Sequence, residues 1–585
     1  RAKTMKAIPR IFLAALLLMA VATTQAQQAR VIEKTLPNGM KVLMLERQGE
    51  PTVSGGWVVK VGSSSERPGI TGMAHLFEHM MFKGTPTLGT SDYEKDQKII
   101  GDQERVRDLM RKEEAKMRAS YRRGEIDDLM KPENQTKRYQ ELNKEFKELI
   151  AAQREILVKN EFDKIYTSAG ASGMNAFTTE DITGYFITVP ANKLELWMWM
   201  ESERQLHPVF REFYAERDVV FEERRMRTES TPLGRAEEQF NSMFWVSHPY
   251  TWPVIGWPSD IPAISKAQAD EFYATFYAPQ NITLVLVGDF KNQEAFTLAQ
   301  KYFGRIPRGK QDAPDVVTLE LEQQIEKRMN AEVEANPQVD ILWHSVPYGH
   351  PDSYALDVIS QVLSDRTGRL YKGLVLGKQV ATSVFARQDS RKWAGLFNAG
   401  GEAKEGSTPA DVEQAIYAEI ERLKTEDVPA KELQKVKNQF AAYEYRKLRN
   451  NFFILIQLIF YEGLGDWKEI NEGGPKAQAV TIDDIKRVAK KYFIKTNRAV
   501  ATYTRKPGGA KDEDPDLVGL DEQQKAFIRR IGGALQSENN VEKLKQNLAA
   551  MAARAGQSGE KERQLMKIYR KKVEARIKEI EGGAK

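Results

Sequence analysis

The sequence predicts an α+β fold of two similar α/β-sandwich halves, with a helical-hairpin insertion in the first half and a helical tail after the second. The chain has 585 residues, which is long enough for several domains, because a single core stops growing near ~250–300 residues. Its hydrophobic content of 41% is that of a globular protein. A helix signal at Ser265 and a strand signal at Asn281 recur 216 residues later, at Thr481 and Asn497. A charged segment at 93–162 interrupts the first half.

The first 26 residues have the pattern of a secretory signal peptide. Basic residues precede the apolar run Ile11–Ala22, and small residues follow up to Ala26. The run is shorter than the ~20 residues that span a bilayer. We therefore expect residues 1–26 to be removed and the mature chain to be periplasmic or secreted by a bacterium, with no stable membrane anchor. An uncleaved anchor is the alternative.

The first half, predicted at 31–308, begins with two strands around the turn Asn38–Gly39, where both residues tolerate positive φ. A further strand is expected at 57–61 and a helix at 72–82. From about 93 to 162 the sequence turns to Lys, Glu, Arg, Gln and Leu at helical spacing, which predicts the inserted hairpin. Such charged helices are either solvated decoration or an arm that binds a partner.

A linker is predicted at 309–318, followed by a second half at 319–507 without catalytic residues of its own. Its helix at 352–359 has neither His nor Glu. The tail at 508–585 has the same charged composition as the insertion and is expected to be helical.

Composition limits the possible metal ligands to histidine and carboxylate side chains. The chain has no cysteine, which excludes disulfides, thiolate nucleophiles and cysteine-type zinc sites. The net charge of +5 comes from 87 basic and 82 acidic residues, a near balance that argues against a nucleic-acid partner. Any metal site must draw on the six histidines and the acidic residues.

The strongest motif is His75-x-x-Glu78-His79. On a helix, His75 and His79 lie one turn apart on the same face, so their imidazoles can bind one ion, and Glu78 lies at the rim of that site. This order is the inverzincin signature. The alternative is a pair of hydrogen-bonded core histidines.

A catalytic zinc needs a third protein ligand. The acidic helix around 216–225 offers Glu216 and Glu223, two turns apart on one face, whereas Glu222 points elsewhere. Spacing alone does not distinguish Glu216 from Glu223 as the ligand.

Together, the two motifs resemble the pitrilysin and insulinase (M16) family of zinc metallopeptidases, of the bacterial two-domain type that is similar to mitochondrial processing peptidase subunits. Gly173–Thr178 resembles that family's strand beside the metal, and Tyr277-Ala-Pro-x-Asn281 resembles a segment of its bacterial members. The similarity covers most of 31–507, without the insertion.

The resemblance implies a role for each matching residue. One Zn²⁺ per chain would be bound by His75, His79 and Glu223, with Glu78 as the general base and Glu216 as a supporting carboxylate. The edge strand would bind the peptide substrate through Asn175, Ala176 and Thr178.

The sequence departs from the family at an Arg and a Tyr of the second half. The family pattern Leu-Arg-Glu-x-x-Gly-Leu-Ala-Tyr corresponds to 374–382, which puts Val375 at the Arg and Thr382 at the Tyr. We expect a heterodimer with a related subunit that lacks the zinc motif and supplies both residues; a homodimer is less favoured. The alternative is that neighbours replace them, namely Arg366, Arg369 and Tyr371 or Lys378.

The resulting prediction is a zinc metalloendopeptidase acting on peptides or unfolded segments. The alternative is a non-catalytic zinc-binding scaffold or assembly subunit of a secreted complex. Glu78 argues against the scaffold, because a structural metal site gains nothing from a carboxylate placed as a base.

Overall fold

The computed structural model describes residues 28–364 and 366–506, individual positions between 524 and 548, and the helix 560–582. The predicted signal peptide at 1–26 lies outside the described residues. The chain forms two compact units, Arg1–Thr504 and Arg505–Lys585. In the second unit, α19 (Glu560–Gly582) bears out the expected helical tail where that tail is described. No helix of the described residues is long and apolar enough to cross a membrane.

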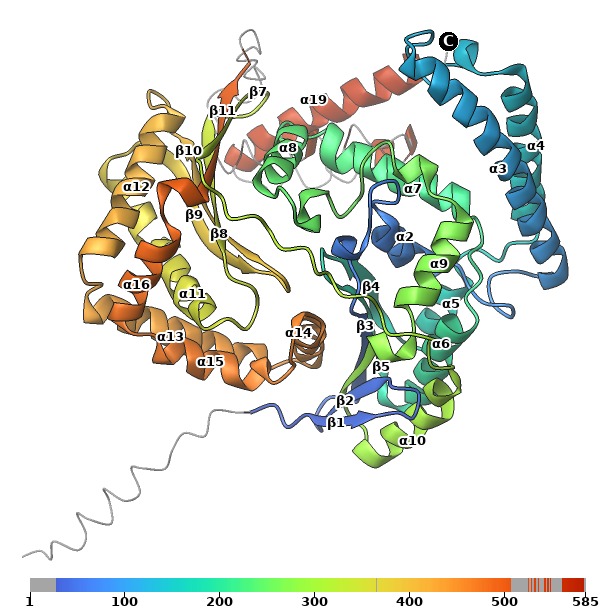
Figure 1. The fold of residues 1–585 in the computed structure, drawn as a ribbon, viewed down its shortest axis with the longest axis horizontal. Helices are drawn as coiled ribbons and strands as arrows, with labels where there is room; N and C mark the ends of the chain where they lie inside the picture. Colours follow the sequence, from blue (N-terminus) through green and yellow to red (C-terminus); the bar gives the residue numbers. More distant parts are fainter. Residues whose placement is uncertain are drawn as a thin grey trace, which may run out of the picture. The chain divides into compact units, whose positions relative to one another are not determined.

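The first half is built on a six-stranded sheet with the order β1-β2-β6-β3-β5-β4 (Figure 1). The predicted turn at Asn38–Gly39 joins β1 to β2, with Gly39 at φ 93°. β4 pairs only with β5 and therefore forms an edge of the sheet. The strands are β1 (Ile32–Thr35), β2 (Lys41–Glu46), β3 (Thr52–Val59), β4 (Ser172–Thr178), β5 (Thr183–Pro190) and β6 (Ile282–Gly288).

Helices cover one face of this sheet and enclose the main hydrophobic core. Trp57 of β3 is fully buried there and stacks on Tyr185 of β5, with ring centroids 4.0 Å apart. Phe77 of the metal-motif helix enters the same core, so apolar burial fixes that helix against the sheet. The helices are α2 (Met73–Met80), α6 (Leu194–Leu206), α7 (Phe213–Arg224), α9 (Lys266–Phe276) and α10 (Asn292–Tyr302).

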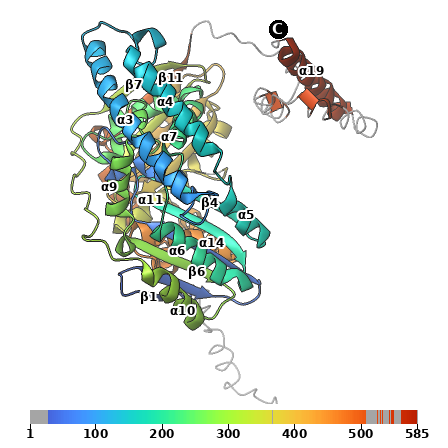
Figure 2. The same cartoon turned by 90° about the vertical axis from the view of Figure 1, so that its right-hand side faces the viewer.

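The predicted insertion is a helical hairpin. α3 (Tyr93–Arg122) and α4 (Lys137–Arg154) pack along each other (Figure 2), and the short α5 (Glu161–Ser168) leads back to β4. A fully buried ion pair between Asp96 and Arg211 anchors the base of the hairpin to the first half. The insertion is therefore packed against the domain and is more than a solvated decoration.

The second half repeats the first. Its sheet has the order β7-β11-β8-β10-β9, which is the order of the first sheet without β1. Both α9 and α16 begin with a capping box, at Ser265 and Thr481, and each leads into the equivalent strand, which confirms the repeat. The strands are β7 (Lys327–Val333), β8 (Gln338–Ser345), β9 (Ala381–Ser390), β10 (Gly395–Ala403) and β11 (Arg498–Arg505), and the helices α11 (Pro351–Leu363), α12 (Pro409–Thr425), α13 (Ala430–Lys447), α15 (Glu469–Ala479) and α16 (Ile482–Tyr492).

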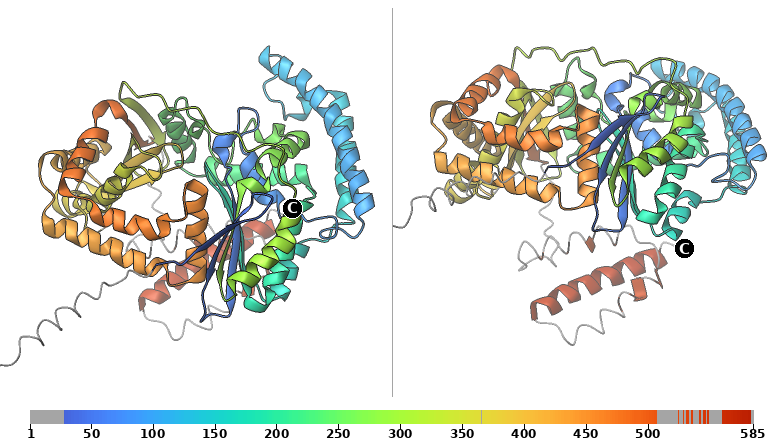
Figure 3. Two further views of the ribbon diagram at one scale, coloured as in Figure 1. Left: turned by 60° about the horizontal axis from the view of Figure 1, so that its bottom comes forward. Right: turned by 90° about the horizontal axis from the view of Figure 1, so that it is seen from below.

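One helix of the second half belongs to the core of the first, which the sequence did not predict. α14 (Asn451–Leu464) packs on the open face of the first sheet, against β3 and β6 (Figure 3). Leu458 and Ile459 are fully buried there. Glu462 of α14 is also fully buried and pairs with Lys41 at 2.9 Å and Lys60 at 2.8 Å. The two halves are therefore joined by a shared core as well as by the linker.

α8 (Gly234–Phe244) of the first half packs against the second sheet. Phe244 at its end stacks on His344 of β8, with ring centroids 3.9 Å apart, and Phe240 joins the same apolar cluster. The face of the second sheet that carries His344 is thus turned toward the first half.

Candidate metal centre

The helix α2 that carries the motif begins at a tightly constrained point. Gly72 before it has φ 90°, and a Cβ there would lie 2.6 Å from the carbonyl oxygen of Ile255, so only glycine fits. The buried carboxylate of Glu66 accepts hydrogen bonds from the N–H groups of Gly72 at 2.8 Å and Ala74 at 2.7 Å. These contacts fix the direction in which the motif side chains project.

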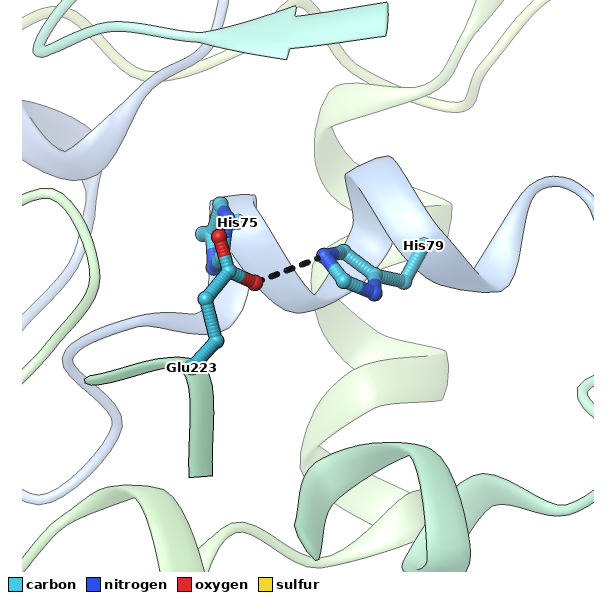
Figure 4. A group of neighbouring side chains, drawn as sticks. All are labelled: His75, His79 and Glu223. Carbon is cyan, nitrogen blue, oxygen red and sulfur yellow. Dashed lines mark ion pairs between the residues drawn. The ribbon is translucent and has the colours of Figure 1, made fainter. Parts of the chain in front are cut away.

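The structure brings together His75, His79 and Glu223, as the resemblance implied (Figure 4). One ligand atom from each lies within 4.8 Å of the other two. His75 Nε2 is 3.8 Å from Glu223 Oε1, and His79 Nε2 is 3.4 Å from Glu223 Oε2. Within the described part of the chain this is the one group of three or more such side chains that converges in this way. Of the two spacing candidates, Glu223 is therefore the one that lies with the two histidines in the candidate metal site.

The donor set fits a zinc ion. Two imidazoles and one carboxylate form a catalytic zinc site that leaves a fourth position for water or substrate. Burial, together with the neighbouring His79, lowers the pKa of His75 to about 3, so its imidazole is neutral and has a lone pair for a metal. Glu223 supplies the negative charge, and its side chain is 15% exposed, which leaves the site accessible.

Glu216 lies behind His79 rather than in the ligand set. Its Oε1 is 2.9 Å from His79 Nδ1, and its Oε2 is 2.5 Å from Lys83 Nζ. Burial opposes ionisation of Glu216, but the hydrogen bonds from His79 and Lys83 lower its pKa to about 2. Such a carboxylate orients the ring of a metal-binding histidine and raises its basicity. Glu222, by contrast, is exposed and pairs with Arg225, as its position on the helix predicts.

Glu78 points toward the edge strand β4. The hydroxyl of Thr178 donates a hydrogen bond of 2.7 Å to Glu78 Oε2. Burial raises the pKa of Glu78 above its ordinary value, although the bond from Thr178 acts in the opposite direction. Of the three predicted substrate-binding residues, Thr178 thus contacts the predicted base.

Asn175 and Ala176 lie further along β4 and line a cavity of about 430 Å³. The same cavity is lined by Glu78 and His79 and, on its other side, by residues 157–162 at the end of the insertion. Because the cavity opens beside the candidate metal site, it offers room there for a side chain of a bound molecule.

Arg227 is a site residue that the sequence analysis did not identify. Its Nη1 is 2.9 Å from Glu223 Oε1, although the Arg227 side chain is 71% exposed. It lies in the π-helical turn Arg225–Glu229 that follows α7. The spacing of four residues from Glu223 was the available signal, since residues four apart on a helix are neighbours.

The segment 374–382, which we expect to correspond to the family pattern, has Val375 and Thr382 at the Arg and Tyr positions. Gln379, which occupies the glycine position of that pattern, has φ 54°, a conformation that favours glycine. This agrees with the alignment that places Val375 and Thr382 at the Arg and Tyr positions. Val375 packs on the second core, and the Thr382 hydroxyl is 2.9 Å from Glu402. Of the proposed substitutes, Arg369 is buried and paired with Glu432, so it is already engaged.

Comparison with known proteins identifies related sequences on both halves. Residues 41–105 match the family described as Insulinase (Peptidase family M16), and residues 263–440 match the Peptidase M16 inactive domain. The chain is 26% identical to the zinc protease PqqE of Helicobacter pylori over 475 residues, which are 79% of this chain and 90% of that protein.

Solved structures show the same fold. A protease from Helicobacter pylori matches with a TM-score of 0.66 at 23% identity, over 82% of this chain and 100% of the other. The periplasmic protease PqqL from Escherichia coli matches with a TM-score of 0.60 at 17% identity, over 85% of this chain and 49% of the other. These matches confirm the predicted α+β architecture of two similar halves.

Proposed function

We propose that this chain, which belongs to the M16 (insulinase) family of zinc metallopeptidases, is an endopeptidase that cleaves extended peptides or unfolded segments. The observation that carries the proposal is the convergence of His75, His79 and Glu223, with Glu78 beside them and outside the ligand set. Extended substrates are favoured because the edge of β4 beside Glu78 suits strand addition, which only an unfolded segment can make.

The residues around the site have separable tasks. A zinc ion held by His75, His79 and Glu223 would supply a Lewis acid for the peptide carbonyl and would lower the pKa of a water molecule to near ~7. Glu78 takes the proton from the attacking water and returns it to the leaving amine; its raised pKa makes it a stronger base for this step. The unpaired edge of β4 can hold the substrate as an added strand, with Asn175 and Ala176 beside the cavity.

A related subunit without the zinc motif is the partner that we propose for this chain. Val375 and Thr382 offer neither a guanidinium nor a phenol to the developing oxyanion. The absence of one such hydrogen-bond donor typically lowers kcat by ~10²–10³-fold. The partner would supply the missing Arg and Tyr, as in the family's two-subunit members. A homodimer is less favoured, because a second copy lacks the same two residues.

We also propose that the chain acts in the periplasm or outside the cell. The signal-like pattern of residues 1–26 supports this, and the similar PqqL is described as periplasmic. The alternative function is a zinc-binding scaffold of a secreted complex. Val375 and Thr382, which replace the family's Arg and Tyr, favour this alternative. It does not explain why Glu78 lies beside the metal site, where a catalytic base would be needed.

The test is hydrolysis of a quenched mixed-peptide library by the chain from residue 27 onward, with zinc content measured in parallel. Glu78→Gln should abolish hydrolysis and retain zinc, whereas Glu222→Gln, on an exposed site of α7, should change neither. Hydrolysis that survives Glu78→Gln would refute the catalytic assignment.

The partner proposal has its own test. The double substitution Val375→Arg and Thr382→Tyr should raise the rate of the isolated chain by about 10²-fold or more, because it restores both donors in the same chain. Full activity of the unaltered chain alone, lost in Glu78→Gln, would refute partner dependence. Stoichiometric zinc without hydrolysis by either version would favour the scaffold.

A further inference from the structure

The turn between β4 and β5 begins at the residue that contacts the predicted base. Thr178 ends β4, and its hydroxyl donates the hydrogen bond of 2.7 Å to Glu78. Within the turn, the N–H of Thr179 donates to the carbonyl oxygen of Ile182 at 2.9 Å. Asp181 lies inside this turn and is 4% exposed. The position of Asp181 is therefore coupled to that of Thr178 through a short, hydrogen-bonded stretch of backbone.

The carboxylate of Asp181 is held from both halves of the molecule. The hydroxyl of Tyr250, in the 3₁₀ turn Pro249–Thr251 of the first half, lies 2.8 Å from both carboxylate oxygens and donates to them. The backbone N–H of Lys392, in the turn between β9 and β10 of the second half, donates to Asp181 at 3.0 Å. The N–H of Trp393 in the same turn donates to the Tyr250 hydroxyl oxygen at 3.1 Å. One buried carboxylate thus joins the β4–β5 turn to a turn of the second half.

An ion pair runs beside these hydrogen bonds. Arg391 Nη1 is 2.9 Å from Glu180 Oε1, and Glu180 precedes Asp181 in the β4–β5 turn. The Arg391 guanidinium also lies over the ring of Tyr250, 5.1 Å from its centroid. Tyr250 is 3% exposed, and its ring packs edge-on against Trp245, which fixes the direction of its hydroxyl.

These contacts are costly to break. A buried hydroxyl and a buried carboxylate that lose each other cannot bond to water instead, so the loss of their hydrogen bond leaves two polar groups without a partner. The second half therefore restrains the β4–β5 turn, and with it the end of β4 that carries Thr178.

We propose that Tyr250 and Asp181 are positioning residues, which act together with the second half to hold Thr178 against Glu78. Displacement of Thr178 frees the Glu78 carboxylate to rotate away from the geometry that proton transfer needs. The second half thus contributes to the reaction through its β9–β10 turn, without supplying there a group that touches the substrate. The assignment rests on the proposed peptidase function and adds to it a means by which the second half aligns the base.

The first test is hydrogen–deuterium exchange of the zinc-loaded chain from residue 27 onward, which needs no turnover. Tyr250→Phe removes the hydroxyl and keeps the ring. The amides of 172–183 should then exchange about 10-fold faster, a value expected for the loss of one hydrogen bond to a charged group, while those of α2 and α7 keep their rates. Tyr503→Phe is the matched control, because the Tyr503 residue is also buried and its hydroxyl has no hydrogen-bond partner among the described residues.

Unchanged exchange at 172–183 in Tyr250→Phe would overturn the proposal, as would an increase of the same size throughout the chain, which would mean general destabilisation. Arg391→Gln removes the ion pair with Glu180 at a side chain that is 17% exposed, and it should raise exchange in the same segment even if Tyr250→Phe folds poorly. Arg391→Lys keeps the charge and should restore slow exchange.

The second test asks whether the restraint acts through Thr178. With a peptide that the chain cleaves, Tyr250→Phe should lower kcat about 10-fold, with less effect on KM and none on zinc content. In a chain that already carries Thr178→Val, Tyr250→Phe should lower kcat no further, because the contact that it supports is gone. Additive losses of kcat would overturn the action through Thr178.

Failure of the peptidase function would look different. A chain that hydrolyses nothing, even with Val375→Arg and Thr382→Tyr, but whose exchange at 172–183 responds to Tyr250→Phe, would keep the restraint of the β4–β5 turn and refute the peptidase.

Discussion

Replacing Glu216 by Gln should weaken zinc binding without removing a metal ligand. Glu216 Oε1 is 2.9 Å from His79 Nδ1, and its other oxygen is 2.5 Å from Lys83 Nζ. A glutamine keeps one acceptor for His79 but turns an NH₂ group toward the Lys83 ammonium, so the ring loses both its fixed orientation and its negative partner. Losing such a carboxylate typically costs 10–100-fold in metal affinity, about 1.4–2.8 kcal/mol.

The assay is competition for zinc with a chelator of known affinity at neutral pH. Glu222→Gln on the same helix is the control, because Glu222 is exposed and its ion-pair partner among the described residues is Arg225. Zinc affinity of the Glu216 variant equal to that of the unaltered chain would refute the argument that this carboxylate acts through His79. An equal loss of zinc affinity in both variants would show that the effect comes from a change in α7 as a whole rather than from the lost contact between Glu216 and His79.

Three further predictions concern stability, measured by urea unfolding. Gly72→Ala should destabilise the chain by about 1–3 kcal/mol more than Gly69→Ala, because both have φ near 90° but only Gly72 meets a neighbouring carbonyl. Leu458→Ala in α14 should cost about 2–5 kcal/mol, and Phe453→Ala, exposed on the same helix, much less. Asp357→Asn should stabilise the chain at pH 8 by up to about 4 kcal/mol and have little effect below pH 4, since burial, with Glu469 adding to it, raises this pKa from 3.8 to about 7.

The sign of the last prediction follows from the direction of the shift. A carboxyl whose folded pKa lies above its unfolded value stabilises the fold while it is protonated, and this stability is lost as pH rises from about 4 to about 7. Equal unfolding free energies of the Asp357 variant and the unaltered chain at pH 8 would contradict it. For the core variants, a loss at Phe453 as large as that at Leu458 would show that burial is not the cause.

Local sequence patterns were sufficient to predict much of the candidate site. His75 and His79 share a face because helix geometry places residues four apart together, whatever the rest of the chain does. The repeat of helix and strand was also visible, because capping residues and alternating apolar residues are read over short windows. The hairpin at 93–162 followed from composition in the same way.

Other features depended on contacts between distant residues, which no local pattern encodes. Helical spacing offered Glu216 and Glu223 equally, and only the packing of α7 on α2 brought Glu223 to the two histidines as the candidate ligand and Glu216 to the far side of His79. The packing of α14 on the first sheet could not be predicted from the sequence either, because an apolar helix does not specify which sheet it covers. Sequence alone thus determined which residue types could perform the chemistry, and tertiary packing decided which of them meet, because side-chain convergence depends on distances that only the folded chain sets.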